Sequence, residues 1–214
     1  MTPRSEPFEK HADRYDAWFE EYEYAYESEL NALRELMPPK PDGVSVGVGT
    51  GRFAAPLGIR VGIDPSTEML RHARHRGIET VVGVGEKLPF RDGAFDAVLV
   101  VTTVCFVDDL GKALREARRV LRDDGVIVIG YVDAESPLGR RYERRKSKNP
   151  FYSEATFVTT DELNEELSKA GFVDTKHVQT VFRMPEEMEG PDQIQSGYGN
   201  GSFVGLRARA DDDT

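Results

Sequence analysis

The stretch that decides the fold is "VSVGVGTGRF", residues 44–53, in which three glycines stand at alternate positions after a short apolar run. Gly47, Gly49 and Gly51 leave the turn after a predicted strand without side chains, so its backbone can approach a ligand or the next helix closely. The dinucleotide pattern G-x-G-x-x-G would need glycine at position 52, where the chain has Arg52, and the Walker pattern is absent. The loop alone therefore leaves open a ligand site or a tight strand-to-helix turn.

Strands and helices alternate downstream of this loop. We expect strands over residues 43–48, 60–64, 79–84, 95–104 and 125–132, helices over 66–76 and within 108–125, and a stunted helix over 51–57. Apolar strands that alternate with helices indicate a parallel sheet covered on both faces, and hence a doubly wound α/β fold. A helix over 159–172 follows, with Thr160 and Asp161 as N-cap candidates. Two β-like stretches, 173–183 and 201–210, could pair antiparallel.

A segment with helical spacing precedes the predicted sheet in the sequence, and a basic segment lies between its strands. Residues 8–37 have helical spacing and end at three prolines, Pro38, Pro39 and Pro41, which predict a stiff hinge. We therefore expect an N-terminal helical cap or lid over 1–41. The main domain would span 42–214, with a basic insertion at about 134–158. Five basic residues of that insertion share one helical face, with Tyr142 and Glu143 facing away, which favours a solvated face or a lid that guides an anionic acceptor.

Composition excludes several classes of function. The formal net charge of −10 disfavours broad binding to nucleic acid or to anionic membranes. The longest apolar runs are far shorter than the roughly 18 residues of a membrane span. The polar N-terminal text contains no signal peptide, so we expect a cytoplasmic protein. The single cysteine, Cys105, excludes an internal disulfide and a cysteine-rich metal cluster.

An acidic residue ends the second predicted strand. Asp64 closes "RVGID", where a carboxylate can accept both hydroxyls of a ribose at the switch point of the sheet. The alternative is an acid that stabilises the start of the next helix, which Pro65 and Ser66 open. A glycine loop combined with an acid at the next strand end favours a cofactor that carries a nucleoside.

At this point the chain resembles the class I S-adenosylmethionine-dependent methyltransferases of the small-molecule type, related to the ubiquinone and menaquinone methyltransferases. The resemblance spans residues 8–132 and is carried by "FEKHADRYDAWF", "VGVGTGRFA", "GIDPSTEML", "VGVGEKLPFRDGAFDAV" and "KALREARRVLRDDGVIVIG". It implies a Rossmann-like, mostly parallel sheet of seven strands whose last strand is antiparallel. It also implies S-adenosylmethionine as cofactor and S-adenosylhomocysteine as product.

The resemblance implies a set of cofactor-binding residues. They are Tyr15, Gly47, Gly49, Thr50, Gly51, Asp64, Pro65, Val84, Gly85, Glu86 and Thr102. Ser45 and Val84 stand where the family commonly has acids that help to hold the cofactor. These departures leave open a protein that binds the cofactor without transferring a methyl group. A nicotinamide-dependent oxidoreductase is a third reading, disfavoured by Arg52.

Methyl transfer from a sulfonium depends on alignment above all, so we assign no catalytic residue and no metal ligand. The candidates for the acceptor site are His11, Thr103, Cys105, Phe106, Arg140 and Arg144. The threonine could equally be a β-former, the histidine is a faint candidate for a general base, and the arginines suit an anionic acceptor. We expect a small-molecule acceptor, whose identity the sequence leaves open together with the oligomeric state.

Overall fold

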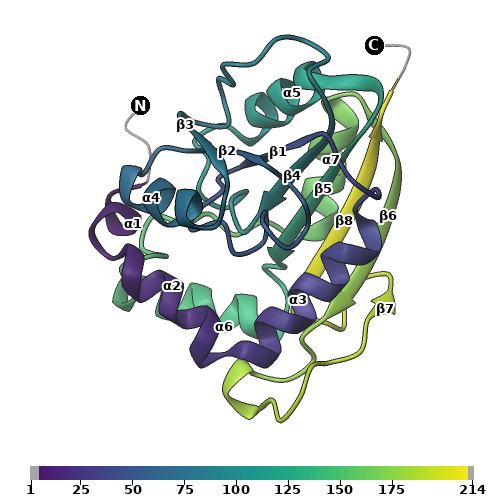
Figure 1. Cartoon of the computed structure of the whole chain (residues 1–214). Helices are drawn as coiled ribbons and strands as arrows, with labels where there is room; N and C mark the ends of the chain where they lie inside the picture. The colour runs from purple at the N-terminus through teal and green to yellow at the C-terminus, as the bar shows by residue number, and fades with distance from the viewer. Residues whose placement is uncertain (1–4, 212–214) are drawn as a thin grey trace.

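The computed structural model describes residues 5–211; the predicted cap and main domain also include residues 1–4 and 212–214, which lie outside the described residues. A single sheet forms the centre, in the order β3-β2-β1-β4-β5-β8-β6-β7 (Figure 1). Its strands are β1 Gly43–Val46, β2 Val61–Asp64, β3 Glu79–Val82, β4 Phe95–Val101, β5 Leu121–Val132, β6 Phe172–Thr180, β7 Gln195–Ser196 and β8 Phe203–Ala210. β1 to β5 are parallel, and β8 lies antiparallel between β5 and β6. The predicted doubly wound α/β fold is confirmed.

The expected number of seven strands is wrong, because the sheet has eight. The extra strand is β7, whose Ser196 pairs with Val178 at the outer edge of β6. It has two residues and lies in the Gly/Pro-rich connection between β6 and β8, where the sequence carries no strand periodicity. The antiparallel pairing of the two C-terminal stretches is confirmed, as β6 and β8 pair from Phe172 to Thr180.

Helices cover both faces of the sheet (Figure 1). They are α1 Glu6–Lys10, α2 Ala12–Glu21, α3 Glu23–Leu36, α4 Thr67–His75, α5 Leu110–Val120, α6 Pro137–Arg145 and α7 Thr160–Lys169, with the 3₁₀ turns η1 Lys146–Lys148 and η2 Pro185–Glu187. α3 and α4 bury apolar side chains in one hydrophobic cluster, and α5 and α7 bury theirs in another. Within residues 5–211, no helix has both the length and the apolar character that a membrane span requires.

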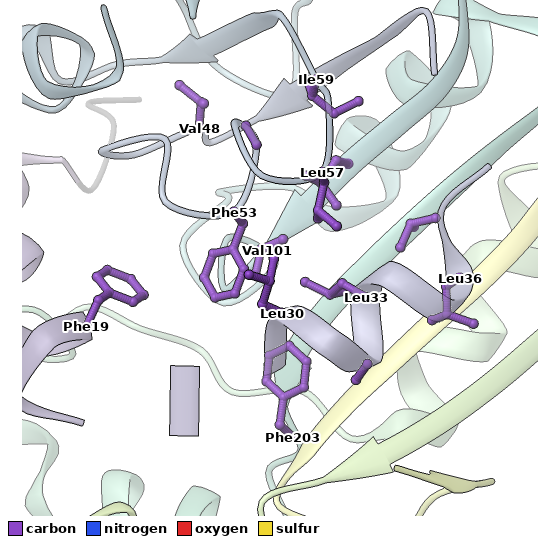
Figure 2. Close-up of a cluster of buried hydrophobic side chains, with 14 of the residues drawn as sticks. Phe19, Leu30, Leu33, Leu36, Val48, Phe53, Leu57, Ile59, Val101 and Phe203 are labelled. Atoms are coloured by element: carbon purple, nitrogen blue, oxygen red, sulfur yellow. The ribbon is translucent and has the colours of Figure 1, made fainter. Parts of the chain in front are cut away.

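α3 is part of the hydrophobic core. Leu33 and Leu36 are fully buried, in a cluster that includes Val101 of β4 and Phe203 of β8. Figure 2 shows these side chains gathered between the helix and the strands. Full burial of a leucine side chain contributes about 1.5–3 kcal/mol, so this contact fixes α3 on the sheet.

Three local predictions differ from the structure. The helical segment over residues 8–37 is three helices, because the backbone leaves helical geometry at His11 and Tyr22. Residues 51–57 form turns and no helix, since too few residues separate the glycine loop from β2. The N-cap of α7 is Thr159, which makes a capping box with Glu162. Thr160 instead bonds to the buried Asp133.

Candidate active site

Two cavities lie beside the carboxyl ends of the parallel strands, where doubly wound sheets bind their ligands. The strand-end cavity, of about 440 Å³, lies against the glycine loop and the ends of β2, β3 and β4. The cap cavity, of about 470 Å³, lies among α2, α3, α6 and the segment 148–152. Tyr15 and Thr102 line both cavities, so the two spaces adjoin there.

The glycine loop presents bare backbone to the strand-end cavity. Gly47 has φ 66°, and a Cβ there would lie 2.3 Å from Oγ1 of Thr103. Gly49 has φ 54°, and its nearest neighbour would be Cε1 of Tyr15, at 4.0 Å, so its open side faces the cavity. Gly51 serves packing instead, since a Cβ there would lie 3.2 Å from the α-carbon of Ala73 in α4. Two of the three glycines therefore shape the cavity wall.

Asp64 places a carboxylate in the wall of the strand-end cavity. Its Oδ2 accepts the N–H of Gly49 at 2.9 Å, and its Oδ1 accepts the N–H of Ser66 at 2.9 Å. Burial raises the pKa of Asp64 to about 6, although these two hydrogen bonds act in the opposite direction. Each oxygen keeps a lone pair, so the carboxylate can accept two hydroxyls of a ligand. The N-cap of α4 is Ser66, which accepts the N–H of Met69.

The facing wall of the strand-end cavity comes from the loops after β3 and β4. Val84 and Gly85 line it. Glu86 joins the two loops, since its Oε1 accepts the N–H of Asp108 at 2.7 Å and that of Asp109 at 3.3 Å. The Glu86 carboxylate thus sets the width of the slot between the loops.

Tyr15 and Thr102 form the junction of the two cavities. Thr102 has φ 49°, which is uncommon for a threonine and typical of strained positions at functional sites. Its N–H donates to the carbonyl of Gly130 at 2.7 Å, which holds this geometry. Burial raises the pKa of Tyr15 to about 12, while a hydrogen bond with Thr102 lowers it, so the phenol stays neutral at physiological pH.

Polar contacts fasten the first two helices over the site. Asp16 of α2 accepts from Nε and Nη2 of Arg52, at 3.0 and 2.7 Å, and from Nη2 of Arg76, at 2.8 Å. Glu9 of α1 accepts the hydroxyl of Ser66 at 2.7 Å. Arg52, which breaks the dinucleotide pattern, therefore connects the glycine loop to α2.

Comparisons with known proteins identify the family. The methyltransferase-domain family model matches residues 44–129. A crystal structure from Thermotoga maritima, described as a SAM-dependent methyltransferase and possible histamine N-methyltransferase, is 46% identical, with a TM-score of 0.93 over 96% of this chain and 99% of that chain. A malonyl-[acyl-carrier protein] O-methyltransferase of Geobacter sulfurreducens is 32% identical over 77% of this chain and 68% of that protein. An uncharacterized protein of Methanocaldococcus jannaschii is 42% identical over 94% and 97%.

The chain is an S-adenosylmethionine-dependent methyltransferase. Its cofactor is S-adenosylmethionine and its product is S-adenosylhomocysteine. The strand-end cavity fits this cofactor, because the open side of Gly49 and the free lone pairs of Asp64 face the same space. Phe8 and Tyr15 also line it, and aromatic rings suit a sulfonium.

Most of the predicted cofactor residues line the strand-end cavity of the methyltransferase. They are Tyr15, Gly47, Gly49, Asp64, Pro65, Val84, Gly85, Glu86 and Thr102. Thr50 and Gly51 line neither cavity. The carbonyl of Thr50 accepts from Arg76 at 2.9 Å, and Gly51 packs on α4. Both residues therefore hold the loop in place from behind.

The structure separates the predicted acceptor residues of the methyltransferase. Thr103 and Phe106 line the strand-end cavity. Cys105 is buried behind it, and its carbonyl accepts the N–H of Thr156. His11 is exposed and lies edge-on to the ring of Phe151, 6.3 Å between centroids. The cysteine and the histidine line neither cavity.

The basic helix α6 faces the cavity with a different side from the one expected. Arg140 and Arg144 are exposed and line neither cavity, whereas Arg141 and Arg145 line the cap cavity. Tyr142, which was expected to face away, also lines the cap cavity. Helical spacing places the charges on one face, but packing against the neighbouring segments turns the aromatic side chain of Tyr142 into the cavity.

The sequence reasoning missed a carboxylate in the cap cavity. Glu29 of α3 is 4% exposed and lines the cavity. It stands on the helical face of Ala25, Leu33 and Leu36, at spacings of four and seven residues, where a buried stripe should be apolar. An acid within an apolar stripe was the signal that could have revealed it. Within residues 5–211, no cluster of histidine, cysteine or acidic side chains is suited to hold a metal ion.

Proposed function

We propose that the methyltransferase binds its cofactor in the strand-end cavity and transfers the methyl group to a small molecule in the cap cavity. The observation that carries this proposal is that Tyr15 and Thr102 line both spaces. The bound cofactor supplies an electrophilic methyl group, whose bond to sulfur breaks as a bond to the acceptor atom forms. The protein's part is to bring two ligands into line at the junction, which can supply most of the rate enhancement.

The cofactor residues in this proposal follow from the cavity wall. The carboxylate of Asp64 would accept the ribose hydroxyls, and the backbone at Gly47 and Gly49 would lie against the amino-acid part. The slot at Val84 and Gly85 would take the adenine. The neutral phenol of Tyr15 would cover the methyl position and keep water from it.

The shape of the cap cavity favours a small acceptor. Its volume lies in the usual range of small-molecule sites, about 300–1,000 Å³. Its lining is rich in aromatic side chains, among them Trp18, Tyr142 and Tyr152. Arg14, Lys148 and other cations also line it, which suits an acceptor with an anionic group at its outer end. The names of the relatives point to different acceptors, histamine for the possible histamine N-methyltransferase and malonyl-[acyl-carrier protein] for the other, so the acceptor class has to come from the cavity.

Two variants test the division of labour between the cavities. Asp64→Ala should weaken S-adenosylhomocysteine binding in calorimetric titration. Tyr142→Ala should keep cofactor affinity within about twofold but lose methyl transfer, measured by formation of S-adenosylhomocysteine with a panel of amines, alcohols and acids. Phe90→Leu serves as the matched control, because Phe90 is half-buried against the hydrophobic core and lines neither cavity.

Three outcomes would contradict the proposal. Saturable binding of NAD without binding of S-adenosylmethionine or S-adenosylhomocysteine would favour the hypothesis of a nicotinamide-dependent oxidoreductase. Cofactor binding without product from any acceptor class would favour the binding-only alternative suggested by Ser45 and Val84. Full activity of Tyr142→Ala would remove the cap cavity from the acceptor site.

A further inference from the structure

The cap cavity contains a buried acid without a partner among the described residues. Glu29 is 4% exposed, and no hydrogen bond or ion pair with another residue of the 5–211 range engages its carboxyl group. The other acids of the cavity are engaged, since Glu186 pairs with Arg141 and Glu21 bonds to Tyr22. Buried carboxyl groups are normally hydrogen-bonded, so an unpartnered one that faces a cavity indicates a ligand group that completes it.

Burial determines the charge state of Glu29. It raises the pKa of this carboxyl group to about 8, so the group is mostly neutral at pH 7. The cations that line the same cavity are Arg14, Arg141, Arg145 and Lys148. None of them contributes to the shift, for which burial is the cause. Arg141 is committed to Glu186, and the other three are exposed, so the cavity itself does not neutralise a Glu29 carboxylate.

Aromatic rings line the same cavity as this carboxyl group. Burial is the main reason that the pKa values of Tyr15, Tyr142 and Tyr152 are raised, and the charge of Glu29 adds to each shift. Tyr142 and Tyr152 stack with ring centroids 4.7 Å apart and planes 29° apart. Aromatic faces attract cations more strongly when water is excluded. A buried carboxyl group that shares its cavity with tyrosine rings is therefore suited to a cation with N–H donors.

We propose that Glu29 binds the amino group of the methyl acceptor, so that the acceptor is an amine held as an ammonium ion between the carboxylate and the tyrosine rings. This inference rests on the proposed function of the cap cavity. When the ammonium ion binds, neutral Glu29 gives its proton to solvent and its carboxylate pairs with the ligand. Before methyl transfer the ammonium ion gives one proton to the Glu29 carboxylate, which frees the nitrogen lone pair to form the new bond to carbon as the bond from carbon to sulfur breaks. The exposed cations of the cavity then face the outer end of the ligand, away from Glu29.

Titration calorimetry of the ligand-free protein tests this recognition without any turnover. The probes are ethylamine and 2-phenylethylamine, with 2-phenylethanol as the uncharged match. We expect the aromatic amine to bind at least tenfold more tightly than the alcohol at pH 7, as charge-assisted hydrogen bonds imply. Binding should release roughly one proton, seen as a different apparent enthalpy in phosphate and in Tris buffer. Affinity should rise between pH 6 and pH 8.5.

Glu29→Gln should remove both the preference for the amine and the proton release, while S-adenosylhomocysteine affinity stays within twofold. Glu21→Gln, an exposed acid of the same cavity, is the matched control and should bind the amine as the parent does. Equal affinity for amine and alcohol, absence of binding of both amines, or amine binding unchanged in Glu29→Gln would overturn the inference. If S-adenosylhomocysteine binds and an alcohol or acid is methylated, the proposed function stands and the amine inference alone fails.

Discussion

Replacement of Asp64 separates its role in cofactor binding from its role in the loop. In Asp64→Ala the ribose loses a charged acceptor, which is worth about 1.5–3 kcal/mol. S-adenosylhomocysteine should therefore bind about 10- to 150-fold more weakly. Asp64→Asn should weaken S-adenosylhomocysteine binding at least as much as Asp64→Ala does, although asparagine keeps one acceptor oxygen. Both carboxylate oxygens already accept a backbone N–H, so the amide NH₂ must face the donor of Gly49 or of Ser66.

The pH dependence of the same site has a defined sign. With a folded pKa of about 6 against an unfolded value of about 3.9, Asp64 holds its proton more tightly in the folded protein. Its contribution to folding stability is present below about pH 4 and is lost as the pH rises through about 6. Cofactor affinity runs the other way, because the hydroxyls bind the ionised carboxylate. It should fall about tenfold between pH 7 and pH 5, where about one carboxyl group in ten is ionised.

Titration calorimetry at pH 5, 6 and 7.5, with thermal unfolding as a check on folding, measures both effects. Asp64→Ala also serves as the control for the pH dependence, because its weak S-adenosylhomocysteine affinity should change little over this pH range. Unchanged affinity in folded Asp64→Ala would refute the ribose assignment. So would a pH dependence in Asp64→Ala equal to that of the parent protein.

The remaining predictions concern the loop, the cap helices and α7. Gly47→Ala should lower the free energy of unfolding by about 1–3 kcal/mol, because the new Cβ would lie 2.3 Å from the side chain of Thr103 at a φ of 66°. Gly49→Ala places its Cβ in open space, so it should lose less stability than Gly47→Ala but more S-adenosylhomocysteine affinity. A Gly49→Ala protein that unfolds at a lower temperature than Gly47→Ala yet binds S-adenosylhomocysteine more tightly would contradict this. Burial raises the pKa of Asp16, but hydrogen bonds from two arginines outweigh it and hold the pKa below its usual range. Asp16→Asn should therefore speed hydrogen exchange in α2 and leave the central strands unchanged, and the parent should approach the variant only below about pH 4. Thr159→Ala should cost about 1 kcal/mol in urea unfolding through loss of the capping box, with cofactor affinity intact.

The sequence predicted the part of the site that lies close together in the chain. A glycine loop after an apolar strand and an acid after the next strand follow from local pattern, and a parallel sheet then brings both to one edge. The cap cavity could not be predicted from local sequence pattern. Its walls come from α2, α3, α6 and the segment 148–152, which meet only through tertiary packing. Tyr142 is an example. Helical spacing predicts which residues share a face with the charges, but it does not predict which face of the helix the neighbouring segments bury.

The three helices of the predicted cap differ in how much of their surface they bury, and this bears on how an acceptor enters. α3 buries Leu33 and Leu36 completely in the core, and Glu29 lies one turn away on the same face. α1 has no buried residue, whereas α2 buries only Ala12 and Phe19 and is also fastened through the ion pairs of Asp16. We infer that any opening of the lid predicted over residues 1–41 is confined to α1 and α2, with the break at Tyr22 as its hinge in place of the prolines. The Glu29 carboxylate would then stay fixed while Tyr15 moves with α2. Closure would bring the ring of Tyr15 over an acceptor that is already bound at Glu29.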